Sequence, residues 1–184
     1  GPNYPGGMHV YLGQPEDLAN LDAIDSVFGS ISDHHFGVRV VGLGWARDGG
    51  PLVGTGSYNY NGGVGAASFY EVAEPRPAEA DSLGLQGPSV SSEFGAAMDL
   101  RGDVNGDGYA DLLVGSPGAD SSEGLAQLWL GAPGGIPSSS VLYRSPSVPG
   151  GRYGASVTHV GDIDGDGYGD FAVGCPGCGD SGAG

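Results

Sequence analysis

Two nine-residue stretches of this chain carry oxygen-bearing side chains at a spacing that suits a hard metal ion. The first, Asp103 to Asp111, reads DVNGDGYAD, and the second, Asp162 to Asp170, reads DIDGDGYGD. Each has a carboxylate or amide at positions 1, 3, 5 and 9, and a glycine at position 6 that permits a tight turn. Because Ca²⁺ prefers such oxygen ligands, the sequence predicts two Ca²⁺ ions per chain.

The predicted ligand set is the same in both stretches. A backbone carbonyl, from Tyr109 or Tyr168, and water are expected to complete each coordination shell. The predicted side-chain ligands are Asp103, Asn105, Asp107 and Asp111 in the first stretch, and Asp162, Asp164, Asp166 and Asp170 in the second.

The residues that follow each stretch argue against an EF-hand. An EF-hand needs a bidentate Glu at position 12 and flanking helices, whereas position 12 here is Val114 or Val173. The apolar runs that follow, LLVG and FAVG, are typical of buried strands, which also disfavours a dockerin-type loop. An acidic turn without metal is the alternative, but two copies at one spacing favour the metal site.

The acidic stretches belong to a longer internal repeat. Phe94-Gly95 recurs as Tyr153-Gly154, and Asp103 recurs as Asp162, both 59 residues later. An earlier copy begins at Phe36-Gly37, and there the segment 44–50, which is poor in carboxylates, replaces the acidic stretch. We therefore expect the first copy to be metal-free.

Each repeat is predicted to hold four strands. In the middle copy these run over 95–100, 110–115, 125–130 and 141–145, and the acidic stretch joins the first two. Frequent glycine and proline between short apolar runs fit tight turns. Four strands in a unit of about sixty residues are typical of a β-propeller blade, so the predicted fold class is all-β.

The composite motif resembles the FG-GAP repeat of integrin α-subunit propellers and of bacterial secreted proteins. It consists of Phe-Gly, then Gly-Asp-x-[Asn/Asp]-Gly-Asp-Gly-Tyr-x-Asp, then an apolar run with Val-Gly-x-Pro. The resemblance covers the chain in three copies and implies calcium at the two acidic stretches. It also implies an extracellular binding, adhesion or scaffold module, although this fold carries many functions.

The repeats are circularly offset along a single domain, 1–184. They span about 30–88, 89–147 and 148–184, and the outer strands missing from the last repeat match 5–30, since Met8 to Pro15 aligns with Ala126 to Pro133. Propellers have about four to eight blades, so three are too few to close a ring. One expectation is that two chains form a homodimer that closes a six-bladed propeller. The other is that the chain is a fragment, completed by the remaining blades of a longer chain.

Composition narrows the classes of partner. The net charge of −16, with only six basic residues, argues against nucleic acid as a partner, because binding phosphates requires clustered Lys and Arg. The sequence contains no run of 18 apolar residues, so membrane insertion is not predicted. No signal peptide is visible, although a leader could have been removed. Cys175 and Cys178 predict a local disulfide, rather than a redox or zinc motif, in a secreted or cell-surface protein.

Other candidate sites are weaker. Tyr and Asn alternate at Tyr58, Asn59, Tyr60 and Asn61. Such side chains can stack on sugars and form adaptable polar contacts, which predicts a ligand-binding site. The same composition is also ordinary for a loop. No catalytic constellation is recognisable, so the chain is not expected to be an enzyme. The alternatives are a lectin-type propeller, an accessory domain of a secreted hydrolase, and a purely architectural spacer; the sequence names no ligand.

Overall fold

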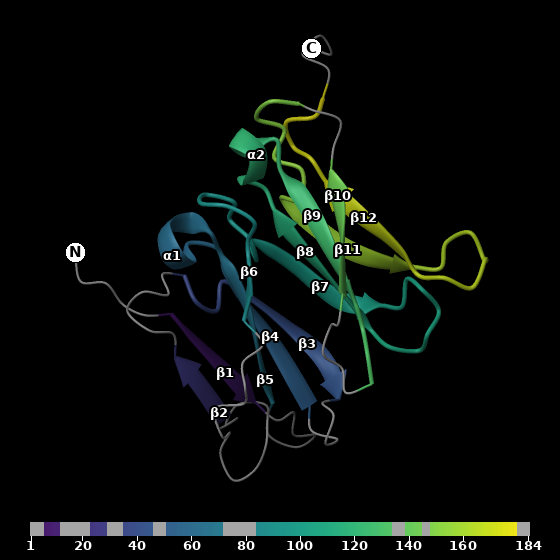
Figure 1. The fold of residues 1–184 in the computed structure, drawn as a ribbon. Coiled ribbons are helices and arrows are strands. Elements are labelled where there is room, and N and C mark those ends of the chain that lie inside the picture. The colour runs from purple at the N-terminus through teal and green to yellow at the C-terminus, as the bar shows by residue number, and fades with distance from the viewer. Residues whose placement is uncertain are drawn as a thin grey trace.

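The chain folds into antiparallel β-sheets in the computed structural model, which describes residues 6–11, 23–28, 35–45, 51–71, 84–133, 139–144 and 148–179 (Figure 1). The predicted all-β fold of propeller-type blades is confirmed. The strands are β1 (Gly7–Tyr11), β2 (Ala23–Phe28), β3 (Arg39–Trp45), β4 (Pro51–Ser57), β5 (Ala66–Glu71), β6 (Leu85–Gln86), β7 (Ala97–Gly102), β8 (Asp111–Ser116), β9 (Leu125–Leu130), β10 (Ser139–Arg144), β11 (Ser156–Gly161) and β12 (Asp170–Gly174).

Two sheets are complete four-stranded blades. Their orders are β3-β4-β5-β6 and β7-β8-β9-β10, so each strand pairs with its neighbour in sequence. The predicted strand over 125–130 coincides with β9, but β7 begins at Ala97 rather than at residue 95. The reason is that Gly95 has a left-handed φ of 85° and lies in the turn that precedes the strand.

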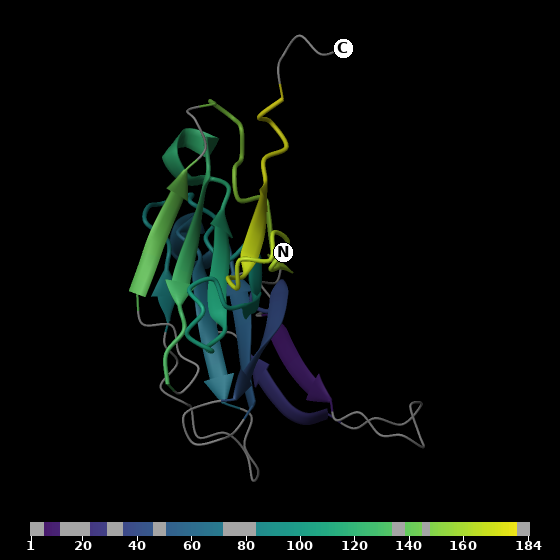
Figure 2. The same ribbon diagram turned by 90° about the vertical axis from the view of Figure 1, so that its right-hand side faces the viewer.

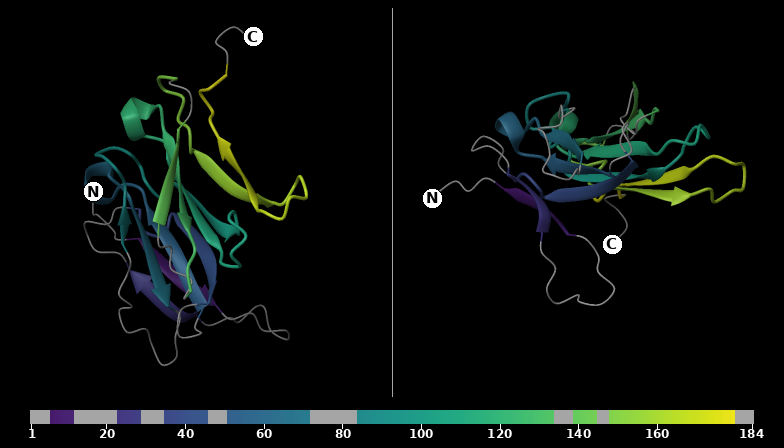
Figure 3. Two further views of the ribbon diagram at one scale, coloured as in Figure 1. Left: turned by 45° about the vertical axis from the view of Figure 1, so that its right-hand side comes forward. Right: turned by 90° about the horizontal axis from the view of Figure 1, so that it is seen from below.

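Within the described ranges, two further sheets have two strands each. β11 pairs with β12, and β1 pairs with β2. These half-sheets lie on opposite sides of the two complete blades, as Figure 1 and the right panel of Figure 3 show. The predicted repeat bounds, and the match of 5–30 to the outer strands of the last repeat, stay predictions.

The core consists of layers between neighbouring blades. Leu112 and Val114 of β8 pack toward β5, whereas Leu113 faces the β11–β12 sheet, which Figure 2 shows beside β7–β10. Both faces of β8 are therefore covered, and its six residues are all buried. An uninterrupted apolar run, rather than an alternating one, is what a strand buried on both faces requires.

The aromatic residue of each Phe-Gly or Tyr-Gly pair joins one blade to the next. Phe94 packs edge-on against Trp129 with ring centroids 5.4 Å apart, and Gly65 forms a parallel β-bridge with Phe94. Gly124 forms the same bridge with Tyr153. This contact therefore recurs at successive blade junctions.

Two short turns, α1 (Tyr60–Gly63) and α2 (Ala119–Ser122), link the second and third strands of the complete blades. Neither is a regular helix, because Asn61, Gly62, Asp120 and Ser121 have positive φ. The predicted loop over 58–61 is thus a tight turn at the end of β4.

Candidate metal centres

The two acidic stretches are the connections between the first and second strands of two successive inner pairs. We call residues 103–110, between β7 and β8, the first loop, and residues 162–169, between β11 and β12, the second loop. They extend from the same side of the molecule in Figure 1. In the first loop Gly108 has a φ of 84°, and its counterpart Gly167 has a φ of 94°, so glycine at position 6 permits the left-handed turn.

The aspartate at position 1 organises each loop. Asp103 accepts hydrogen bonds from the backbone N–H groups of Asp107, at 3.0 Å, and Gly108, at 2.8 Å. Asp162 accepts the corresponding bonds from Asp166, at 3.1 Å, and Gly167, at 2.8 Å. The N–H of Gly167 contributes most to holding the pKa of Asp162 below its ordinary value, so this carboxyl group is readily ionised.

The side chains at positions 3 and 5 turn toward the same centre. Asp164 accepts a hydrogen bond from the N–H of Asp166 at 3.1 Å, and Asp166 accepts one from Tyr168 at 2.9 Å. Carboxylate oxygens of Asp162, Asp164 and Asp166 all lie within 4.8 Å of one another and are exposed. Three oxygens of this kind fit a hard divalent cation.

The first loop has the same geometry with one amide. Asn105 takes the place of Asp164, and its Nδ2 donates to Oδ2 of Asp107 at 2.8 Å. The N–H of Tyr109 donates to Oδ1 of Asp107 at 2.9 Å. Because Asn105 is uncharged, the first loop has less repulsion between its side chains than the second loop has between its carboxylates.

The aspartate at position 9 braces the loop. Asp111 is fully buried, and its two oxygens accept hydrogen bonds from the N–H groups of Val104 and Gly131, each at 2.7 Å. Asp170 accepts from Ile163 at 2.9 Å. Among the described residues, neither Asp111 nor Asp170 belongs to the carboxylate cluster, and metal contact by the carbonyls of Tyr109 and Tyr168 stays a prediction.

The two loops contact each other directly. The N–H of Gly169 donates to the backbone carbonyl of Asp103 at 2.7 Å. The ring of Tyr168 lies over Gly106, so closely that a Cβ added to Gly106 would be 3.1 Å from it. The first and second loops therefore form one continuous acidic surface. The counterpart in the first copy falls largely on residues 46–50, outside the described residues, so its metal-free character stays a prediction.

The turn over 58–61 lies at the opposite end of the strands. Tyr58 stacks on His35 with ring centroids 4.7 Å apart, and it lines a cavity of about 340 Å³ together with Arg39 and Arg152. Asn59, Tyr60 and Asn61 do not line this cavity. Neither arginine is predicted from the sequence, although Arg152 directly precedes the Tyr-Gly landmark and forms a 2.7 Å ion pair with Glu93.

A polar cluster between blades was also missed. Asp99 of β7 is 5% exposed and accepts hydrogen bonds from the side chain of Arg101 and from Thr158 and the N–H of His159 on β11. Burial alone would raise the pKa of Asp99, but these donors together lower it to about 2. The repeat gives no signal here, because the positions equivalent to Asp99 hold Val41 and Thr158.

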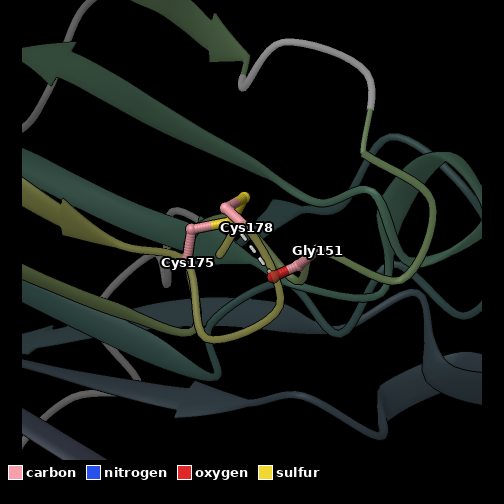
Figure 4. Close-up of a disulfide and its surroundings, with 3 residues drawn as sticks. All are labelled: Gly151, Cys175 and Cys178. Carbon is pink, nitrogen blue, oxygen red and sulfur yellow. Dashed lines mark hydrogen bonds between the residues drawn. A yellow bond between two sulfur atoms is a disulfide. The ribbon is translucent and has the colours of Figure 1, made fainter. Parts of the chain in front are cut away.

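Cys175 and Cys178 are joined by a disulfide just after β12 (Figure 4). Their Cα atoms are 5.4 Å apart, and Sγ of Cys175 lies 3.0 Å from the carbonyl oxygen of Gly151. A disulfide sulfur carries no hydrogen, so this is a packing contact. It fixes the end of β12 against the turn that precedes Tyr153.

Comparison with known proteins places the acidic loops in a recognised repeat. Residues 103–173 match the model of the FG-GAP-like repeat. The chain is 34% identical over 107 residues to integrin alpha-PS2 of Drosophila melanogaster, covering 53% of this chain and 8% of the relative. It is 30% identical over 97 residues to integrin alpha-8 of Gallus gallus, covering 49% of this chain and 9% of the relative. The matched region therefore spans less than a tenth of each relative.

Proposed function

Taking the chain as an FG-GAP repeat protein of the propeller type, we propose that it is a calcium-stabilised extracellular module for binding or adhesion. The observation that carries the proposal is the convergence of Asp162, Asp164 and Asp166 in an exposed loop whose backbone N–H groups fix all three carboxylates. The matching hydrogen bonds of Asp103 and Asp107 extend the proposal to the first loop.

The role of the ion is structural. Like charges held this close repel one another, and a divalent cation neutralises them while it fixes the connection between two inner strands. Extracellular modules of this kind hold Ca²⁺ with a Kd on the order of 10⁻⁴ to 10⁻³ M. The second loop, with one more carboxylate, is expected to bind at least as tightly as the first.

The proposal is tested by thermal unfolding of the metal-stripped chain with and without added calcium at constant ionic strength. At a hundredfold excess over Kd, each site contributes about 2.7 kcal/mol, which raises Tm by several degrees in a chain of this size. Asp164→Asn and Asn105→Asp form a matched pair, because each gives one loop the third residue of the other. The first should reduce the calcium-dependent rise in Tm, and the second should increase it. A Tm that calcium leaves unchanged in all three proteins contradicts the structural role.

The kind of partner is a protein or a glycan that meets the face opposite the loops. Support comes from the cavity beside Tyr58, where the exposed Arg39 has no carboxylate partner among the described residues and Arg152 is already paired with Glu93. A glycan array separates a lectin from a protein-binding module. The described part of the chain includes no helix with the length and apolarity that a membrane span requires.

We also propose that the module is extracellular and that it is not an enzyme. A disulfide between Cys175 and Cys178 is favoured by an oxidising compartment. The roles given above to the clustered carboxylates are structural, and none of them requires a reacting substrate. An assay of hydrolase activity on generic ester, peptide and glycoside substrates tests the prediction that the chain is not an enzyme. We expect no turnover above background. Turnover that a point substitution in this chain abolishes would contradict the prediction.

A further inference from the structure

The sequence has two Asn-Gly pairs, Asn61-Gly62 in the turn α1 and Asn105-Gly106 in the first loop. In such a pair the backbone nitrogen of the glycine can attack Cγ of the asparagine, because glycine has no side chain to obstruct the approach. A bond between that nitrogen and Cγ forms, the bond from Cγ to Nδ2 breaks, and Nδ2 leaves as ammonia with the proton of the glycine N–H. Water then opens the cyclic imide to aspartate or isoaspartate.

The pair in α1 is turned away from this reaction. Asn61 has a left-handed backbone, with φ 49° and ψ 53°. Because the substituents of Cα are arranged tetrahedrally, this ψ places the nitrogen of Gly62 on the opposite side of the Cα–C bond from Cβ, and thus away from Cγ. Attack at Asn61 therefore requires the turn to change its backbone conformation first.

The first loop leaves the nucleophile unrestrained. Four glycines of the two loops follow an asparagine or an aspartate. The backbone N–H groups of three of them, Gly108, Gly165 and Gly167, donate to the carboxylate at position 1 of their loop at 2.7 to 2.8 Å. The N–H of Gly106, the counterpart of Gly165, has no hydrogen-bond acceptor among the described residues. An N–H bonded to a carboxylate must leave it before its nitrogen can attack, and Gly106 is spared that step.

The side chain of Asn105 is also set for attack. It is exposed, so water reaches it. Its Oδ1 accepts a hydrogen bond from the N–H of Asp107 at 3.3 Å, and its Nδ2 donates to Oδ2 of Asp107 at 2.8 Å. Negative charge develops on Oδ1 when the nitrogen of Gly106 attacks, and the N–H of Asp107 is placed to stabilise that charge.

We propose that Asn105 is a site of spontaneous deamidation, with Gly106 supplying the nucleophile, and that calcium in the first loop suppresses the reaction. The suppression rests on the calcium proposal above, since an Asn105 side chain that holds the ion cannot turn toward the nitrogen of Gly106. The aspartate product gives the first loop the carboxylates of the second. The isoaspartate product lengthens the backbone by one methylene, which displaces the remaining ligands and weakens calcium binding.

The test is incubation of the metal-stripped chain at mildly alkaline pH, with and without calcium at constant ionic strength. Peptide mass spectrometry locates each deamidated asparagine, and enzymatic methylation detects isoaspartate. We expect modification at Asn105 well before Asn61. At roughly a hundredfold excess of calcium over Kd, about 1% of the loops are empty, so the rate at Asn105 should fall by up to about a hundredfold.

The matched control is Asp164→Asn, which gives the second loop the same Asn-Gly sequence while the N–H of Gly165 donates to Asp162 at 2.7 Å. Both loops are then compared within one metal-free protein. Deamidation at position 164 should be about tenfold slower than at Asn105, the ratio that corresponds to breaking one hydrogen bond to a charged group.

The deamidation site is wrong if the metal-free chain keeps Asn105 intact, if Asn61 reacts first, or if positions 105 and 164 react equally fast in the variant. A rate at Asn105 that calcium does not change, while calcium still raises Tm, would overturn the suppression. A rate and a Tm that both ignore calcium would overturn the calcium proposal and leave the deamidation site standing.

Discussion

At the scale of single residues, Asp99 shows how one carboxylate can hold two blades together. It lies on β7, yet two of its hydrogen-bond donors, Thr158 and His159, belong to β11. The side chain of Asp99 is 8% exposed, whereas that of its ion-pair partner Arg101 is 73% exposed. The hydrogen bond from Arg101 contributes most to lowering the pKa of Asp99, while the bonds from His159 and Thr158 are the ones that join the two blades.

We predict that Asp99→Asn destabilises the fold by about 2 kcal/mol at neutral pH, which is the free energy that corresponds to lowering the pKa from 3.8 to about 2. Because the folded pKa is depressed, the ionised carboxylate stabilises the fold fully above pH 3.8, and this stabilisation is lost as pH falls toward 2. Urea unfolding of the unsubstituted chain and of the Asp99→Asn variant at several pH values measures this difference in stability.

The difference between the two proteins should be constant from pH 7 to pH 5 and should shrink below pH 4. Titration of the calcium loops is common to both proteins and does not enter the difference. Arg101→Gln serves as the control and should cost less, because the guanidinium is mostly solvated. A difference that stays the same down to pH 2.5 would argue that the carboxylate charge is irrelevant.

Residue spacing alone predicts the loops but not the inter-blade cluster. The positions of Asp103 and Asp162 follow from a local motif, in which one turn brings all its side chains together. Asp99 meets His159 only because β7 and β11 become neighbours in the fold, 60 residues apart. The cavity lined by Tyr58 and Arg152 depends on the same long-range contacts, so the sequence predicts Tyr58 only as loop chemistry.

At the scale of elements, the first and second loops are mechanically linked. The carbonyl of Asp103, the residue that starts the first loop, accepts a hydrogen bond from Gly169 of the second. A Cβ at residue 169 would lie 2.7 Å from that carbonyl oxygen, so only glycine allows the approach. The linkage predicts that a change in the second loop alters calcium binding at the first.

We predict that Gly169→Ala weakens calcium binding by the first loop. The test uses a background with Asp162→Ala and Asp164→Ala, in which only the first loop binds. Displacing one hydrogen bond costs about 0.5–1.5 kcal/mol, so the Kd should rise by roughly twofold to tenfold in a calcium titration. Ile163→Ala, at a 75% exposed position of the same loop, is the control. An unchanged Kd in the Gly169 variant would show that the loops act separately.

The extents of the elements were predictable where burial is local. β9 and β8 follow directly from their apolar runs, because a strand between two blades must be apolar on both faces. The start of β7 was predicted too early, since the left-handed Gly95 belongs to the turn. β6 is only Leu85–Gln86, and no apolar periodicity could fix so short a strand.

At the scale of the whole molecule, the repeat spacing relates segments that lie far apart in the sequence. The 118-residue relation between Met8 and Ala126 predicts an outer hairpin before the first complete blade, and β1–β2 has that position. The number of blades in a closed ring does not follow from the sequence, because each repeat contacts only its neighbours and the same unit serves rings of several sizes.

The central claim is that each of the two loops binds one Ca²⁺ ion. An anomalous difference map from crystals of the 184-residue chain grown in calcium tests it most directly. We expect two peaks per chain, one in each loop, with oxygens of Asp103 or Asp162 at about 2.3–2.6 Å from the ion. Loops that carry no peak at saturating calcium, with their hydrogen bonds unchanged, would contradict it.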